Sequence, residues 1–198
     1  MVSCKPILDQ LEASLREVLG EDAGYTVFRS LNGSSIRVFI TVPGTPLIVG
    51  YSTLCTGDKK TPFLGIELPG VLEVFASISS SAMVQFAQKL IKAVSEVKIM
   101  RLGIIEGYRI VYLGVDFDEL LNIAGEDKLN EKAIANNLLL FFFLASELAA
   151  WIERSYAEAL KGGEIGDFSM SKIIEGLKLL LGSVGVVCCW LGGQSPAG

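Results

Sequence analysis

One stretch of the chain, residues 133–151, places the strongest constraint on the fold. It reads AIANNLLLFFFLASELAAW and lies inside a helix that the sequence predicts over residues 130–161. From Leu138 to Ala145 every side chain is apolar. A helix that is apolar on all sides has to be covered on all sides. The rest of the chain, or a second copy of it, must therefore surround this helix.

The two sides of the predicted helix differ in what they present. Helical spacing places Ile134, Leu138, Phe141, Ala145, Leu148, Ile152 and Ala159 on one stripe, the natural core face. The opposite side, here called the outer stripe, carries Leu140, Phe143, Leu144 and Trp151. Either another segment of the chain covers the outer stripe, or the stripe binds a second copy or another protein. We hypothesise that the chain associates through this stripe, either as a homodimer or with a protein partner.

Composition excludes several classes of protein. Of the 198 residues 51% are hydrophobic and 20% are charged, which is typical of a globular chain and not of a disordered one. The net charge of −5 argues against binding of nucleic acid, which needs a basic surface. Uncharged apolar runs are shorter than the ~18–20 residues of a membrane span. The first residues contain no hydrophobic signal core, so we expect a cytoplasmic location.

The absence of histidine removes much of the usual enzyme chemistry, including Ser-His-Asp triads and most zinc sites. The four cysteines do not replace it. Cys4 and Cys55 are isolated, and Cys188 and Cys189 are adjacent instead of showing the CxxC spacing of a metal or redox site. We expect all four to be free and no disulfide to form, since no secretory signal is visible. The sequence thus predicts no catalytic residues and no cofactor.

One acidic cluster leaves an alternative function open. Asp116, Asp118 and Glu119 follow a predicted strand, and carboxylates of this kind are suitable ligands for Mg²⁺ or Ca²⁺. The competing interpretation is a helix N-terminus, where acidic residues stabilise the helix dipole. A small-molecule-binding protein or a metal-assisted enzyme could use Asp116, Asp118, Glu119 or Glu106.

Hydrophobic periodicity and turn residues predict the order of elements. Asn32-Gly33 is a strong signal for a β-hairpin. The predicted helices cover residues 5–19, 82–96, 130–161 and 167–181, and the predicted strands cover residues 25–30, 36–42, 47–55, 63–68, 71–79, 97–105 and 108–117. The last two strands are apolar on both faces, so both faces are expected to be covered.

These elements predict an α+β fold. It consists of an antiparallel β-meander and a β-hairpin packed with helices, one long central hydrophobic helix and a helical C-terminal appendage. Residues 1–162 are expected to form the α+β domain, and residues 163–198 an appendage packed on the same core. Within the appendage, residues 184–191 are expected to be a buried, strand-like segment.

The element order looks like the α+β fold of type III secretion chaperone-like proteins. The similarity rests on the helix at 5–19, the meander at 25–55, the helix at 82–96, the hairpin at 97–117 and the long helix at 130–161, about three quarters of the chain. It is a similarity of element order without a residue motif. The resemblance implies a non-catalytic dimer that binds other polypeptides. Together these observations predict a non-enzymatic, chaperone-like protein-interaction module that acts through an apolar helix face.

Overall fold

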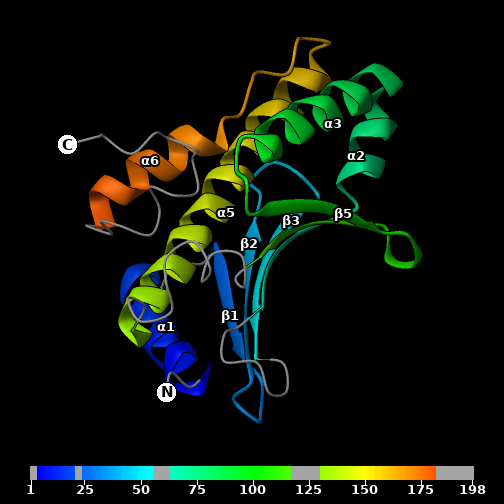
Figure 1. Ribbon diagram of the computed structural model, residues 1–198. Helices are drawn as coiled ribbons and strands as arrows, with labels where there is room; N and C mark the ends of the chain where they lie inside the picture. The colour runs from blue at the N-terminus through cyan, green and yellow to red at the C-terminus, as the bar shows by residue number, and fades with distance from the viewer. Residues whose placement is uncertain (1–3, 21–23, 56–62, 117–129, 182–198) are drawn as a thin grey trace, which may run out of the picture.

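The structure, a computed structural model, describes residues 4–20, 24–55, 63–116 and 130–181. A six-stranded antiparallel sheet has the strand order β1-β2-β3-β4-β6-β5. The described helices gather on one side of this sheet, with the longest one, α5, lying diagonally across it (Figure 1). The predicted α+β class is therefore confirmed.

The sheet combines a four-stranded meander with a hairpin. Its strands are β1 (Tyr25–Arg29), β2 (Ser35–Thr41), β3 (Ile48–Leu54), β4 (Phe63–Pro69), β5 (Met100–Ile105) and β6 (Ile110–Val115). The predicted turn between β1 and β2 is present. The side-chain oxygen of Asn32 accepts a hydrogen bond from the Ser34 amide at 3.1 Å, and Gly33 adopts a positive φ of 70°.

Four of the five described α-helices begin and end close to the bounds that the sequence predicted. They are α1 (Cys4–Leu19), α2 (Val71–Ile78), α3 (Ser80–Ser95), α5 (Glu131–Leu160) and α6 (Met170–Leu181), with a 3₁₀ turn, η1 (Glu106–Tyr108), between β5 and β6. The Asn130 side chain accepts a hydrogen bond from the Ala133 amide at 2.9 Å and caps α5. Ser79 caps α3 in the same way, through the Ala82 amide at 3.0 Å.

The predicted strand at residues 71–79 is wrong, because this segment is the helix α2. Gly70 adopts a left-handed conformation and turns the chain out of β4. Val71, Val74, Phe75 and Ile78 then recur at helical spacing and face the core. The β-branched residues favoured a strand in the sequence, but the tertiary packing of this apolar face favoured a helix.

Helix α5 is the centre of the core. It packs on β2 and β3 and is surrounded by α1, α2 and α6. The buried Tyr51 hydroxyl of β3 donates a hydrogen bond to the Leu138 carbonyl of α5 at 2.7 Å, and burial raises the pKa of Tyr51 well above its usual value. By length and composition α5 alone among the described helices could cross a membrane. However, 67% of its most apolar window is buried inside the fold, as in a core helix.

The chain itself covers most of the outer stripe. Leu140, Leu144 and Trp151 are buried and Phe143 is partly buried. Trp151 lies between two aromatic rings, Phe86 of α3 and Phe168 before α6, at centroid distances of 4.8 and 5.2 Å. Its indole N–H donates to the Gly166 carbonyl at 3.0 Å. Leu140, Leu144 and Trp151 are therefore covered by the same chain, which is one of the two alternatives for this stripe. These three side chains offer no exposed surface to a partner.

The segment that leads into α6 is held against α3 by polar contacts. Asp167 accepts hydrogen bonds from Lys89 at 2.5 Å and from Lys92 at 3.0 Å, and the bond from Lys89 is the main cause of its lowered pKa. Glu96 accepts hydrogen bonds from the hydroxyls of Ser169 and Ser171, at 2.7 and 2.9 Å. These contacts hold in place the segment that covers Trp151. The predicted strand at 184–191, with Cys188 and Cys189, lies outside the described residues.

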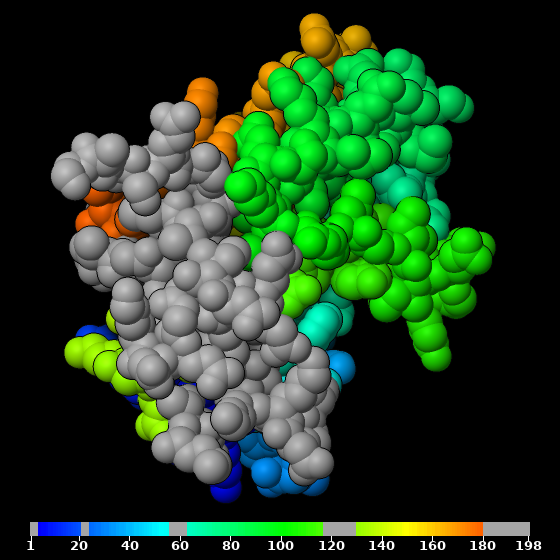
Figure 2. All heavy atoms as spheres, viewed as in Figure 1, coloured from blue at the N-terminus to red at the C-terminus, as the bar shows by residue number. Residues whose placement is uncertain are grey.

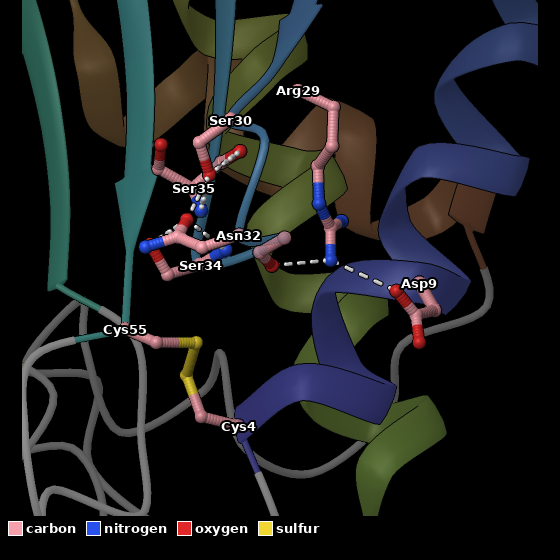
Figure 3. The surroundings of a disulfide bond; sticks show 9 residues. Cys4, Asp9, Arg29, Ser30, Asn32, Ser34, Ser35 and Cys55 are labelled. Atoms are coloured by element: carbon pink, nitrogen blue, oxygen red, sulfur yellow. Dashed lines mark hydrogen bonds and ion pairs between the residues drawn. A yellow bond between two sulfur atoms is a disulfide. The ribbon is translucent and has the colours of Figure 1, made fainter.

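A disulfide joins Cys4 at the start of α1 to Cys55 just after β3 (Figure 3). The expectation that all four cysteines are free is therefore wrong for these two. They are separated by 51 residues, so their spacing gave no local motif, and the fold brings their Cα atoms to 5.9 Å. Nearby, Arg29 of β1 forms an ion pair with Asp9 of α1 at 2.8 Å. The N-terminal helix is thus attached to the sheet both covalently and by charge.

Replacing Cys4 and Cys55 with Ser should lower the free energy of unfolding by about 4 kcal/mol, because the disulfide closes a loop of this length in the unfolded chain. Urea denaturation would measure the change. A reductant should destabilise the wild type by a similar amount and leave the double variant unaffected. Equal stability of the wild type in oxidising and reducing buffer would contradict the pairing.

Glu96 should make stability depend on pH. Burial is the largest single influence on the pKa of Glu96 and raises it, but the hydrogen bonds from Ser169 and Ser171, with Lys92, lower it below its usual 4.5 overall. A lowered folded-state pKa adds stability above pH 4.5 that is lost as the pH falls through the folded pKa. Glu96→Gln should therefore be less stable than the wild type at neutral pH, and the difference should shrink below pH 4.5.

The matched control for this measurement removes the hydrogen-bond donors. In a Ser169→Ala/Ser171→Ala background, Glu96→Gln should change the free energy of unfolding much less at neutral pH. A Glu96→Gln effect that is the same in both backgrounds would show that these hydroxyls do not hold the carboxylate.

Candidate interaction surface

One face of the sheet is turned away from the helices. In each strand alternate residues point to opposite faces. On β2, Ile36, Val38 and Ile40 are buried toward the helices, whereas Arg37 between them and Thr41 after them are exposed. No helix in the described part of the chain packs on the side to which Arg37 points (Figure 1). This side is called the open face below.

The open face carries several large apolar side chains. Antiparallel sheets with one solvated face normally carry polar residues there. Here five large apolar side chains point outward from three strands, β1, β3 and β4, and from the end of β5 nearest its turn. Each is between 40% and 54% exposed: Phe28, Ile48, Leu54, Phe63 and Ile105. Exposed apolar side chains that gather on one face mark interaction sites more often than chance.

Glycines make the middle of the open face flat. Gly65 and Gly114 are directly paired across β4 and β6, and a Cβ atom at Gly65 would lie 3.4 Å from the Phe63 ring. At Gly103 of β5 a Cβ atom would lie only 2.3 Å from the Tyr112 ring, because that ring lies on the glycine backbone. The rings of Phe63 and Tyr112 therefore rest on the sheet and present an aromatic platform.

Charge on the open face is sparse and of mixed sign. Arg37 is exposed and forms no hydrogen bond or ion pair among the described residues. Glu67 is partly buried and accepts a hydrogen bond from Ser52 at 3.3 Å. Arg101 donates to the Met100 carbonyl at 3.1 Å and also to the Lys98 carbonyl. This surface is not organised to hold a phosphate or a metal ion, and it suits an apolar partner with few charges.

The turn of the β5–β6 hairpin extends the apolar surface beyond the body of the protein. Residues 104–110, called the arm below, stand out from the body and overhang a recess beside the open face (Figure 2). Ile104 points to the side of the helices and is 61% exposed, while Tyr108 at the tip is 78% exposed. Ile105 lies on the open face. The arm therefore carries exposed apolar side chains on both of its sides.

The acidic cluster is described only in part. Asp116 is exposed, and its amide donates a hydrogen bond to the Ile99 carbonyl at 2.9 Å, whereas Asp118 and Glu119 lie outside the described residues. Glu106 is at the opposite end of β6, roughly 20 Å away by strand length. It therefore cannot join Asp116 in one metal site. Among the described residues no group of three acidic or cysteine side chains could hold a metal ion.

The chain matches no protein-family model, no curated protein and no solved structure. A function is therefore inferred from the open face and the arm. The sequence predicted cover on both faces of β5 and β6, whereas the described helices lie on only one side of the sheet.

Phe63 and Phe86 should differ sharply in their contribution to stability. Phe63→Ser should cost about 1 kcal/mol of unfolding free energy, since the side chain is 48% exposed and only part of its burial is lost. Phe86→Ala should cost about 3–5 kcal/mol, because this ring is fully buried between Phe75 and Trp151. Chemical denaturation would measure both. A Phe63→Ser cost as large as that of Phe86→Ala would mean that Phe63 is a core residue.

Proposed function

We propose that this protein is a non-enzymatic, chaperone-like interaction module that binds an apolar stretch of another polypeptide on the open face. The observation that carries the proposal is the group of half-exposed apolar side chains around the aromatic platform. It replaces the outer stripe of α5 as the binding surface, because the chain covers most of that stripe itself.

The energy available on the open face suits a protein ligand of moderate affinity. Each of its five large apolar side chains is about half exposed, so complete burial would add on the order of 1 kcal/mol per side chain. Part of this gain offsets the cost of ordering the bound segment. The flat platform favours an extended or sheet-like ligand over a small molecule, which normally binds in a concave pocket.

The order of elements supports the chaperone-like part of the proposal. A first helix, an antiparallel meander, a helix, a hairpin and a long helix follow one another here as in type III secretion chaperone-like proteins. This chain adds β4, α2 and α6 to that order. The resemblance therefore supports the proposed class, non-catalytic binding of polypeptides, and assigns no individual residue.

The chemistry of the open face supports a binding role over a catalytic one. Two of its polar side chains, Ser52 and Glu67, are hydrogen-bonded to each other. The chain has no histidine to act as a general base. The groups that remain suit recognition of a surface better than bond cleavage.

Fluorescence anisotropy with labelled peptides would test the proposal. Short extended peptides rich in Leu, Ile and Phe should bind the wild type, and peptides with Gln at those positions should not. Phe28→Ser/Phe63→Ser should weaken binding about tenfold or more, because two of the exposed rings are lost.

The matched control for the peptide measurement is Ile91→Ser. Ile91 is 55% exposed on α3, away from the open face, so its loss should leave peptide affinity unchanged. Equal peptide binding by the wild type and by Phe28→Ser/Phe63→Ser would contradict the proposal.

A further inference from the structure

A flat partner surface could cover only one of the two sides of the arm. Ile104 points to one side of the β5–β6 ribbon and Ile105 to the other, and both are more than 40% exposed. Tyr108 lies at the tip with most of its ring in solvent. Only a recess can cover both sides of a two-stranded ribbon at once.

The same chain provides such a recess. The space beneath the arm is bordered by the arm itself and by the body of the sheet (Figure 2). The open face of the body carries the aromatic platform and the exposed ring of Phe28, which contacts Phe39 edge-on at 5.6 Å. An arm placed in this recess would have apolar groups on both sides.

We propose that the open face is occupied by a second copy of this chain, in a twofold dimer in which each arm enters the recess of the other protomer. One side of the arm then packs against the partner's open face, and the other side packs against the partner's arm. The contact is reciprocal, as a closed twofold interface requires. This inference rests on the proposed function, since both use the open face, and it names one occupant of that face.

Charge favours the same pairing. Glu106 at the arm's tip and Arg37 on the open face are both exposed, and neither forms an ion pair with the described residues. In a reciprocal dimer the two opposite charges meet across the interface, twice by symmetry. A strongly acidic or strongly basic partner would satisfy only one of them.

The size of the surface is adequate for a dimer. Six strands spaced about 4.8 Å apart give a face about 24 Å wide, and strands of this length extend about 20 Å. The resulting face of about 480 Å² is more than half of the roughly 800 Å² that each partner contributes to a stable interface, and the arm adds to it.

Analytical ultracentrifugation of the full chain over a concentration series would test the dimer. The wild type should dimerise. An arm variant, Ile104→Ser/Tyr108→Ser, and a face variant, Phe28→Ser/Phe63→Ser, should each raise the dimer Kd by about tenfold or more. The control Ile91→Ser/Leu160→Ser removes two equally exposed side chains elsewhere and should dimerise like the wild type.

Mixing the two variants gives the sharpest result. In a heterodimer of arm variant and face variant, the intact arm of one chain meets the intact face of the other, so one of the two contacts is fully restored. An equimolar mixture should therefore form heterodimers more tightly than either variant forms homodimers. In the same way Arg37→Glu and Glu106→Arg should each weaken the dimer, and the double variant should recover most of the loss.

Each outcome decides the proposal. A monomeric wild type at all concentrations overturns it, and so does a dimer that both variants leave intact. Dimers of the variants without recovery on mixing would place the interface elsewhere and overturn it as well. The peptide measurement is independent, so peptide binding by a monomeric protein would leave the proposed function standing while the dimer fails. Normal unfolding curves for both variants exclude misfolding as the cause of dissociation.

Discussion

The physical constraint on which this fold depends is the helix α5, whose middle is apolar on every side. Nothing in water can stabilise such a helix unless all of its sides are covered. The sheet covers one side through β2 and β3, and α1, α2 and α6 cover the others. Tyr51 adds a directional contact between sheet and helix, and Trp151 is enclosed by Phe86 and Phe168. The polar contacts of Asp167 and Glu96 with their partners hold that enclosure closed.

This use of the helices has a consequence for the sheet. Every described helix gathers on the side of α5, and none is left to cover the opposite side of the six strands. A sheet in this position would ordinarily carry polar residues on its solvated face. This one carries aromatic rings that rest on glycines and a hairpin that projects beyond the body. Because the described helices all pack around α5, they leave the apolar side chains of the opposite sheet face uncovered. The proposed function uses this face.

The sequence predicted the parts of the fold that depend on local signals. The periodicity of α1, α3 and α5 and the Asn-Gly turn before β2 are confirmed. It failed where distant packing decided the result. Tertiary contacts of Phe75 overrode the strand propensity of α2, and only the folded chain brings Cys4 close to Cys55. The sequence shows the apolar residues Phe28, Leu54 and Phe63, but which face the helices would leave uncovered follows only from the three-dimensional arrangement.

The most direct test of this account compares the solvent exposure of the two apolar surfaces. Hydroxyl-radical footprinting read by mass spectrometry, at a protein concentration low enough to suppress association, reports the reactivity of each aromatic side chain. The account predicts rapid oxidation of Phe28, Phe63 and Tyr108 and strong protection of Phe141 and Trp151. Raising the protein concentration should then protect Phe28, Phe63 and Tyr108 together. Trp151 reacting as fast as Tyr108 in the folded protein would contradict the account, because α5 would then be the exposed surface.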